Sequence, residues 1–350
     1  MSKIIFVSGN LERGGAQRVM SLLANEYEAK GWQVSVAVLL DAHKGYELSS
    51  DVKIVNLSRK GNYLKNIPSW IRDLRSLFQR ERPDVIVSFV GRINLITMVA
   101  AAGLGIPVIV SERNDPARDR RGAFEVWLCK LFYSRADRVV FQTNYQRSFY
   151  GDKVKRNAVI IGNPIAAQPY YGSHPSEDFV AVGKLMEQKD HSTLIRGFRE
   201  IAEEFPGLKL HIYGEGSLRQ ALQQQIREFG LEDRVILEGN CKEIFMVMQR
   251  NRYFVMSSRY EGLSNALLEA MVSGMVCIST CWDGVEDVIQ HGKNGYLVPC
   301  GDHLALADCL RDVLCKEHGS LIGEAIRTGE FYLSENIMGC WFEAIESIIR

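Results

Sequence analysis

The 350-residue sequence lacks the features that mark several large classes of protein. Its eight cysteines form no C-x-x-C pair and its seven histidines form no H-x-x-x-H, so no spacing predicts a structural metal site. No window reaches about 18 uninterrupted apolar residues, the length that a membrane-spanning helix needs. The first ten residues, MSKIIFVSGN, indicate a strand and are too short for a signal peptide, so we expect a cytoplasmic protein.

The formal net charge is zero, yet the charge is divided unevenly along the chain. Residues 1–165 carry 25 lysines and arginines against 15 aspartates and glutamates, a net charge of +10, and the remainder carries −10. Hydrophobic residues make up 46% and charged residues 24%, as expected for folded domains without a bias toward disorder. The length and the charge asymmetry predict two domains with different partners.

The order of the apolar segments predicts an alternating α/β protein. Near-continuous runs of Val and Ile are typical of strands that are covered on both faces of a parallel sheet. Such runs occur in KIIFVSG, QVSVAVLL, VKIVNL, DVIVSFV, PVIVSE and RVVFQT, and then again in FVAVGKL, LKLHIYG, RVILEG, YFVMSS and MVCIST. We therefore expect two doubly wound domains, each of which binds its ligands at the carboxyl ends of its strands.

Proline, glycine and serine gather between the two series of strands and indicate a domain boundary. We place an N-terminal domain at residues 1–163, a linker at 164–178 and a C-terminal domain at 179–332. Apolar residues recur at helical spacing in the last segment, 333–350. This pattern predicts an amphipathic helix that packs back toward the N-terminal domain.

Glycines and lysines follow several of the predicted strands. Gly14 and Gly15 precede a helix in NLERGGAQR, where backbone N–H groups can approach an anion, although an ordinary turn is the alternative. Lys184 and Lys189 follow a strand in VGKLMEQKD and could clamp a diphosphate, with a solvated basic turn as the alternative. Exposed backbone near Asn240, in EGNCKE, could meet the edge of a base.

The segment SSRYEGLSNALLEA places two glutamates eight residues apart among small and apolar residues. A helix predicted to begin near Ser264 would make an anion site from the backbone N–H groups of Leu263, Ser264 and Asn265. Glu261 would face the group attached to that anion, and Glu269 would lie on the inward side of the helix. Carboxylates are rarely buried without a partner. A nucleotide sugar, with hydroxyl groups at both ends and phosphates between, has the shape that satisfies both.

Taken in order, these segments resemble the family-4 retaining glycosyltransferases. The resemblance covers essentially the whole chain, through GGAQR, SERND, GNPI, VGKLMEQKD, YGEGSLR, EGLSNALLEAMVSG and DGVEDVIQHGKNGYLV. The E-x7-E element combined with the K-x4-K turn is its most specific part. The resemblance implies the GT-B fold, in which two Rossmann-like, doubly wound parallel-sheet domains face a central cleft.

The resemblance also implies how a nucleotide-sugar donor is held. Gly15 and the loop before it would contact the diphosphate from the N-terminal domain, while Lys184, where the family more often has arginine, and Lys189 would take its negative charge. Glu261 would bind hydroxyl groups of the transferred sugar, and Glu269 would hold the ribose. The remaining donor contacts would come from Gly14, Asn240, Cys241, Gly262, Leu263, Ser264 and Asn265.

One position departs from the family pattern. Many relatives place a histidine near the donor sugar after the strand that here ends VIVSERNDP, and this chain has Arg113 instead. Arginine can bind an acceptor or donor oxygen but is no general base at ordinary pH. We therefore expect catalysis by positioning and by stabilisation of the leaving diphosphate, carried by Glu261, Lys189, Lys184 and Arg113. No D-x-D follows a strand, so we expect neither a metal ion nor a cofactor besides the UDP-sugar co-substrate.

The segment 59–83 combines seven basic residues and two acidic residues with an apolar stripe that includes Trp70, Leu74 and Phe78. Such a helix can lie on an anionic membrane. The alternative is a surface helix that packs on its own sheet. No nucleic-acid-binding motif is present, so we expect peripheral membrane binding and no nucleic acid. A second basic cluster in the same domain consists of Arg113, Arg118, Arg120 and Arg121.

These expectations leave three functions open. The leading hypothesis is a transferase that extends a polyprenyl-diphosphate-linked glycan of a surface polysaccharide or glycoprotein at the cytoplasmic face of the inner membrane. Its donor would be a UDP-sugar such as UDP-N-acetylgalactosamine, because SERND is similar to hexosamine transferases. The alternatives are a GT-B epimerase acting on UDP-N-acetylglucosamine and a catalytically silent subunit that binds a nucleotide sugar. The E-x7-E element fits the epimerase poorly, and the intact charged residues argue against the silent subunit.

Overall fold

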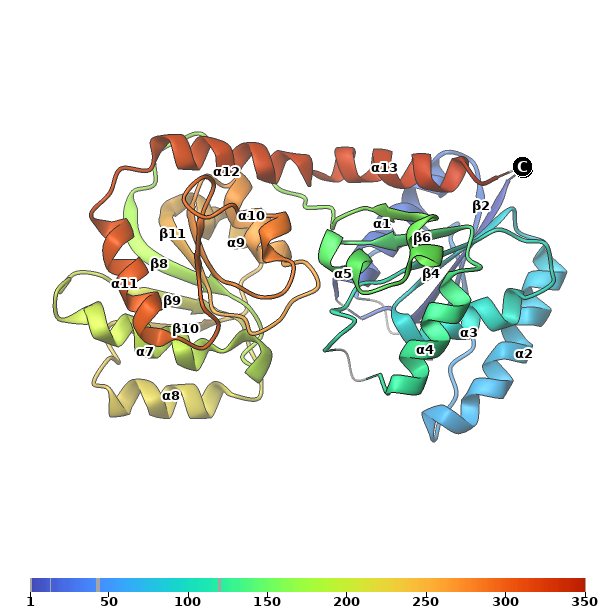
Figure 1. The fold of residues 1–350 in the computed structure, drawn as a ribbon, viewed down its shortest axis with the longest axis horizontal. Helices are drawn as coiled ribbons and strands as arrows, with labels where there is room; N and C mark the ends of the chain where they lie inside the picture. Colours follow the sequence, from blue (N-terminus) through green and yellow to red (C-terminus); the bar gives the residue numbers. More distant parts are fainter. Residues whose placement is uncertain (1, 13, 42–44, 119–120, 350) are drawn as a thin grey trace. The chain divides into compact units, whose positions relative to one another are not determined.

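The computed structural model shows a chain folded into two compact units (Figure 1). Unit 1 comprises residues 1–164 and 335–350, and unit 2 comprises residues 165–334. None of the helices in the part of the chain that the structure describes is long and apolar enough to cross a membrane. Arg120 of the predicted basic cluster lies outside that part. The residues described are 2–12, 14–41, 45–118 and 121–349.

Unit 1 is built on a seven-stranded sheet in the order β3-β2-β1-β4-β5-β6-β7. All of its strand pairs are parallel. Every residue of β4 and β5 is buried, as the continuous apolar runs predict. The strands are β1 (Lys3–Asn10), β2 (Gln33–Asp41), β3 (Lys53–Asn56), β4 (Val85–Phe89), β5 (Val108–Ser111), β6 (Arg138–Phe141) and β7 (Ala158–Ile160).

Helices cover both faces of this sheet. In Figure 1, α2, α3 and α4 lie together on one side of it, while α1 and α13 lie on the other. Two ring contacts hold α13 in place, because Phe342 meets Tyr27 of α1 at a centroid distance of 5.1 Å and Trp341 meets Phe89 at 5.8 Å. The helices are α1 (Gly15–Ala29), α2 (Tyr63–Glu81), α3 (Gly91–Ala101), α4 (Ala123–Tyr133), α5 (Asn144–Ser148), α6 (Asp152–Lys155) and α13 (Ser334–Glu346).

The apolar stripe of α2 is used inside unit 1, which corrects its proposed role as a membrane-facing surface. Trp70, Leu74 and Phe78 are fully buried in the core of this unit. The Trp70 indole also donates a hydrogen bond of 3.0 Å to the carbonyl of Leu57. These three residues have no surface left for lipid, whereas Tyr63, Ile67 and Ile71 of the same stripe are only partly buried. Arg75 is engaged as well, since it donates to the carbonyls that end α3.

Unit 2 is built on a six-stranded sheet in the order β10-β9-β8-β11-β12-β13, again with parallel pairs throughout. The two parallel sheets confirm the predicted α/β class. The strands are β8 (Ser176–Val182), β9 (Leu210–Tyr213), β10 (Val235–Gly239), β11 (Asn251–Met256), β12 (Val276–Thr280) and β13 (Tyr296–Val298). The helices are α7 (His191–Ala202), α8 (Arg219–Glu228), α9 (Ile244–Arg250), α10 (Asn265–Val272), α11 (His303–Leu314) and α12 (Gly319–Phe331), with the short 3-10 turns η1 (Glu187–Lys189) and η2 (Val285–Asp287).

The predicted linker at 164–178 differs from the structure, which includes most of it in unit 2. The backbone N–H of Ile165 donates to the carbonyl of Tyr332, and that of Tyr170 donates to the carbonyl of Val272. Strand β8 then begins at Ser176, inside the range predicted to be a linker. Proline, glycine and serine correctly indicate irregular backbone here, but the hydrogen bonds that fix such backbone come from residues far along the chain.

Candidate functional site

Each sheet reverses its strand order at one point, and the predicted glycines, lysines and Glu261 follow strands at these two points. The reversal lies between β1 and β4 in unit 1 and between β8 and β11 in unit 2. At such a point the loops that leave two neighbouring strands diverge and open a crevice. Gly14 and Gly15 follow β1, residues 183–190 follow β8, and residues 257–264 follow β11.

Lys189 and Glu261 form a direct ion pair at the β8–β11 crevice. The Lys189 ammonium donates to Oε1 of Glu261 at 2.6 Å, and the Ser258 hydroxyl donates to the same oxygen at 2.6 Å. The amide of Gln188 approaches Oε2 at 3.4 Å. The side chains of Lys189 and Glu261 are 18% and 9% exposed. The fold therefore brings together two charged groups that are 72 residues apart in sequence and leaves both side chains mostly buried.

The two loops that carry this pair are bound to each other. The Ser257 hydroxyl donates to the backbone carbonyl of Lys189 at 2.9 Å. Asp190 adopts a left-handed conformation with φ of 45°, and its carboxylate accepts from Arg259 and Thr193, each at 2.9 Å. These contacts explain why a residue other than glycine tolerates that conformation. They also fix the direction from which Lys189 enters the crevice.

Glycine is required where the loops after β8 and β9 touch. A Cβ on Gly214, whose φ is 141°, would lie 2.1 Å from the carbonyl oxygen of Gly183. A Cβ on Gly216 would lie 2.3 Å from that of Leu185. The N–H groups of Gly183 and Leu185 in turn donate to carbonyls in the β9 loop. A larger residue at Gly214 or Gly216 would therefore displace the loop after β8, which carries Lys184 and Lys189.

The E-x7-E element spans the start of α10. Ser264 is the N-cap of this helix and accepts a hydrogen bond of 3.4 Å from the backbone N–H of Leu267. Glu261 precedes the helix, while Glu269 lies within it, and the two residues are 8% and 9% exposed. Leu263 between them is buried as well. Both residues are thus largely buried, Glu261 just before the N-terminus of α10, which is a favourable place for an anion, and Glu269 in the middle of the helix.

The other predicted donor contacts lie at the same edge of the sheet but are more open. Lys184 is exposed, and its ammonium forms no ion pair with any residue that the structure describes. Asn240 and Cys241 are exposed in the loop after β10, and Gly262 is partly exposed. Lys184 and Lys189 therefore differ in this structure, since one is free in solvent and the other is held by Glu261.

His191, which the sequence reasoning passed over, lies at the first position of α7, two residues after Lys189. It is 4% exposed, and neither ring nitrogen reaches hydrogen-bond geometry, although the backbone of Gly183 and Lys184 approaches the ring. Burial, followed by the positive charge of Lys189, lowers the pKa of His191 to about 4. The imidazole is therefore neutral at ordinary pH and lies against the backbone of the loop that carries Lys184. A single histidine without a metal-ligand spacing gives no sequence signal for such a role.

Arg113, at the carboxyl end of β5 in unit 1, is buried, and among the described residues it forms no ion pair with a carboxylate. Its guanidinium donates to the Ser111 hydroxyl at 2.8 Å and to Oδ1 of Asn163 at 3.0 Å, and it lies over the rings of Phe89 and Trp341. Its Nη2 has no hydrogen-bond partner in the described structure. Burial lowers the pKa of Arg113 to about 9. A buried guanidinium with one unused nitrogen is prepared to bind an anionic or strongly polar ligand.

Asn163 connects Arg113 to the glycine loop that starts α1. Its Oδ1 accepts from Gln142 at 2.6 Å as well as from Arg113, and its Nδ2 lies 3.7 Å from the point where Gly15 would carry a Cβ. Gly14 is the N-cap of α1 and supplies no side-chain hydrogen bond to the first turn. The helix N-terminus and the buried guanidinium therefore belong to one cluster at the carboxyl edge of the sheet.

Glu112 and Arg121 form a buried ion pair that fixes the segment carrying Arg113. Arg121 donates to Oε2 of Glu112 at 2.8 Å, and the hydroxyls of Tyr150 and Tyr133 donate to the same oxygen at 2.9 and 3.3 Å. A Cβ on Gly91 would lie 2.2 Å from the Arg121 guanidinium, so a larger residue there would displace this group from Glu112. Arg121, predicted to belong to a surface basic cluster, is instead inside the protein and unavailable to a membrane.

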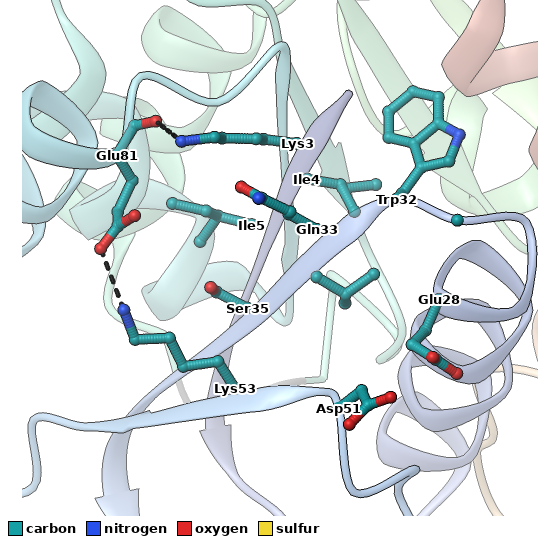
Figure 2. A pocket seen from close by; sticks show the side chains of 12 residues that line it. Lys3, Ile4, Ile5, Glu28, Trp32, Gln33, Ser35, Asp51, Lys53 and Glu81 are labelled. Atoms are coloured by element: carbon teal, nitrogen blue, oxygen red, sulfur yellow. Dashed lines mark hydrogen bonds and ion pairs between the residues drawn. The ribbon is translucent and has the colours of Figure 1, made fainter. Parts of the chain in front are cut away.

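A hollow at the opposite edge of the unit 1 sheet has a different character (Figure 2). It encloses about 370 Å³ at the amino ends of β1, β2 and β3. Lys3 and Lys53 converge there on Glu81, which accepts 3.2 Å and 3.1 Å hydrogen bonds at its carbonyl and carboxylate respectively. Its two lysines are thus held by Glu81, and it lies away from the edge at which ligands bind in such sheets.

Comparison with known proteins places both units in one enzyme class. Residues 14–164 match the family described as glycosyl transferase 4-like domain, and residues 176–316 match glycosyl transferases group 1. A Campylobacter jejuni GalNAc-alpha-(1->4)-GalNAc-alpha-(1->3)-diNAcBac-PP-undecaprenol alpha-1,4-N-acetyl-D-galactosaminyltransferase is 26% identical over 99% of both chains. A second enzyme of that organism, the N-acetylgalactosamine-N,N'-diacetylbacillosaminyl-diphospho-undecaprenol 4-alpha-N-acetylgalactosaminyltransferase, is 24% identical over 90% of both chains.

Solved structures agree on the fold. The Anabaena HepE protein in complex with UDP and glucose superposes with a TM-score of 0.84 at 16% identity, over 99% of this chain and all of that one. At this identity the likeness concerns the architecture alone. Together, the two family matches, the full-length relatives and the two parallel-sheet units show that the chain belongs to the family-4 glycosyltransferases of GT-B fold.

Proposed function

We propose that this glycosyltransferase moves an N-acetylhexosamine, such as N-acetylgalactosamine, from a UDP-sugar to a polyprenyl-diphosphate-linked glycan, with retention and without a metal ion. The observation that carries the proposal is the Lys189–Glu261 pair at the β8–β11 crevice. A lysine beside a carboxylate offers one group to a diphosphate and one to sugar hydroxyls. Glu269, buried within α10, would serve the ribose.

The chemistry follows from these charges. The bond between the anomeric carbon and the UDP oxygen breaks, and a new bond forms between that carbon and an acceptor hydroxyl oxygen. In the proposed front-face reaction, the acceptor proton passes to the departing phosphate oxygen. Lys189 and Lys184 stabilise the negative charge that develops on the diphosphate, and Glu261 stabilises the positive charge on the sugar ring. Because the lysines supply positive charge, the reaction does not require a divalent cation.

Unit 1 is the proposed acceptor unit. Its residues 1–164 carry a net charge of +10 and its residues 335–350 a net charge of −2, and Arg113 offers an Nη2 without a hydrogen-bond partner in the described structure at the carboxyl edge of its sheet. A diphosphate-linked glycan is anionic and would be attracted by such a field. The names of the two Campylobacter relatives, both of which act on undecaprenol-linked glycans, support this choice of acceptor. A lipid-linked acceptor would bring the protein to the cytoplasmic face of a membrane as a peripheral enzyme.

The test is UDP release and product formation with UDP-N-acetylgalactosamine and a polyprenyl-diphosphate-linked oligosaccharide, in the presence of EDTA. We expect release that depends on the acceptor and a product with an α-anomeric linkage, read from its proton NMR spectrum. A β linkage would contradict retention, and a need for added Mn²⁺ or Mg²⁺ would contradict metal independence. Conversion of UDP-N-acetylglucosamine without an acceptor would indicate the epimerase, and binding of donor without turnover would indicate the silent subunit.

A further inference from the structure

The outward face of α4 is apolar, which is the reverse of an ordinary surface helix. Phe124, Trp127 and Leu131 follow one another at spacings of three and four residues and are 69%, 56% and 37% exposed. The rings of Phe124 and Trp127 stack with their centroids 5.8 Å apart. The opposite face of α4 places Cys129 and Tyr133 in the core of unit 1. The helix is therefore apolar on the side that folding does not use.

An apolar groove of about 380 Å³ continues this face between α2, α3 and α4. Ten of its twelve lining residues are aliphatic or aromatic, and Phe124 stands at its edge. The other two, Arg92 and Glu125, are joined by hydrogen bonds of 3.0 and 2.9 Å. Leu64, at the start of α2, also lines the groove and is 66% exposed. The groove together with Leu64, Phe124, Trp127 and Leu131 is called the α4 surface below.

Positive charge borders the α4 surface. Lys60 and Lys65 precede and follow the start of α2, and Lys130 lies next to Leu131 on α4. All three lysines are exposed. The acidic side chain in the groove, Glu125, is neutralised by its bidentate contact with Arg92. Exposed aromatic residues bordered by lysines are suited to the interface of an anionic bilayer, where rings enter the acyl boundary and ammonium groups meet the headgroups.

We propose that the α4 surface is the part of this protein that binds an anionic lipid bilayer, with Phe124 and Trp127 in the acyl boundary and an acyl chain in the groove. The proposal rests on the proposed function, because a lipid-linked acceptor requires the enzyme to meet a membrane, and it names the surface that does so. The bordering lysines favour the bilayer over a second copy of the chain, since two positively charged surfaces repel each other. This surface includes the partly exposed part of the α2 stripe, Tyr63, Ile67 and Ile71, and excludes the buried Trp70, Leu74 and Phe78.

Tryptophan fluorescence provides a direct test, because Trp127 is 56% exposed whereas Trp70, Trp282 and Trp341 are at most 1% exposed. The fifth tryptophan, Trp32, is partly exposed but lines the hollow at the amino ends of β1, β2 and β3 and does not line the groove of the α4 surface. The full chain is mixed with vesicles of phosphatidylethanolamine and phosphatidylglycerol whose acyl chains are brominated, without any polyprenyl lipid. We expect the bromines to quench the fluorescence of the wild type. In Trp127→Phe, which keeps an apolar ring, we expect vesicle binding to persist and most of the quenching to disappear.

A second experiment measures the partition coefficient onto the same vesicles. The double variant Phe124→Ser with Trp127→Ser should lower it roughly tenfold or more, since two large apolar side chains are lost from the interface. Phe331→Ser is the matched control, because Phe331 is 58% exposed but lies in unit 2, and it should leave partitioning unchanged. The unfolding midpoint of each variant verifies that it is folded.

Four results would overturn the proposal: no quenching of the wild type, equal partitioning of the double variant, binding that requires a polyprenyl diphosphate, or self-association that the double variant abolishes. The last two would assign the surface to the acceptor lipid chain or to a second copy of the protein. The quenching and partitioning assays contain neither donor nor acceptor, and polyprenyl diphosphate is added to the vesicles only in a separate comparison that tests whether binding requires it. A failure of the proposed transferase activity therefore leaves their outcome untouched, and the reverse also holds.

Discussion

Glu261→Gln and Glu269→Gln should impair the enzyme in different ways, although both glutamates are buried, one just before α10 and one within it. The changes keep the size of each side chain, so neither creates a cavity. Glu261→Gln removes a charge that meets Lys189 at 2.6 Å and Ser258 at 2.6 Å. The Ser258 hydroxyl can still donate to the glutamine carbonyl. The expected cost in unfolding free energy is about 1 kcal/mol, for one partly sheltered ion pair.

The effect of Glu261→Gln on the reaction should be larger than its effect on stability. Loss of one preorganised charge from a transition state costs about 2–4 kcal/mol. Lys189 already neutralises part of the Glu261 charge, so we expect the lower end, about 2 kcal/mol, which is roughly a 30-fold fall in kcat. The donor KM should change little, because the positive charge on the sugar ring develops after binding.

Glu269→Gln should mainly raise the donor KM. The proposed ribose contact is the same in the ground state and in the transition state, so its loss weakens binding without changing the chemical step. A hydrogen bond to a charged group is worth about 1.5–3 kcal/mol, and glutamine keeps one acceptor oxygen. We therefore expect a rise in KM of about tenfold with kcat preserved.

The assay is steady-state kinetics with the donor varied at saturating acceptor, combined with urea unfolding of each variant. Glu204→Gln serves as the matched control, because Glu204 pairs with Arg311 on the surface of unit 2, and it should leave both constants unchanged. Equal effects of the two changes on kcat and KM would refute the assignment of the two glutamates to sugar and ribose. A loss of more than about 4 kcal/mol of stability in either variant would show that the pair is structural.

Three further expectations follow from the two crevices. EDTA should leave UDP binding and turnover unchanged, and a chelator-sensitive rate would show that the lysines do not supply the positive charge. Between pH 6.5 and about 4, His191 binds a proton in the unfolded chain but stays neutral in the folded protein, so the unfolding free energy of the wild type should fall by roughly 3 kcal/mol as the pH drops. Urea titrations at each pH should show that His191→Gln lacks this part of the pH dependence of stability. Arg113→Met should keep or raise unfolding stability, because it removes a buried unpaired charge, yet raise the acceptor KM; an unchanged KM would remove Arg113 from the site.

Much of the fold could be predicted because its signals are local. Continuous Val and Ile runs indicate buried parallel strands, and glycine or serine before an apolar helix indicates a loop at the carboxyl edge of the sheet. The structure follows these signals in β4, β5 and β12, whose residues are all buried. Glu261 and Lys189 could be singled out because each follows a strand. The sheet order then brings these two residues together, although they are 72 positions apart in the sequence.

The remaining features depend on tertiary contacts that no local pattern carries. A basic amphipathic segment reads the same whether its stripe faces a bilayer or its own sheet, and only the packing of Trp70 and Leu74 decides for α2. Arg121 looks like a surface charge until Glu112 and two tyrosines enclose it. The apolar outer face of α4 could not be predicted either, because Phe124 and Trp127 lie in a mostly apolar segment, AFEVWLCKLFY, where they resemble core residues.

The most direct test of the nucleotide-sugar site is a calorimetric titration of UDP into the wild type, Lys189→Met and Lys209→Met, each in EDTA. Methionine keeps most of the lysine stem, which packs against Gly183, and removes only the charge. Lys209 is exposed in unit 2 immediately before β9, at the other end of the strands from Lys189. We predict one UDP per chain, roughly tenfold or weaker binding by Lys189→Met, and wild-type affinity for Lys209→Met. Equal affinity of all three proteins would contradict the assignment of the β8–β11 crevice to the donor diphosphate.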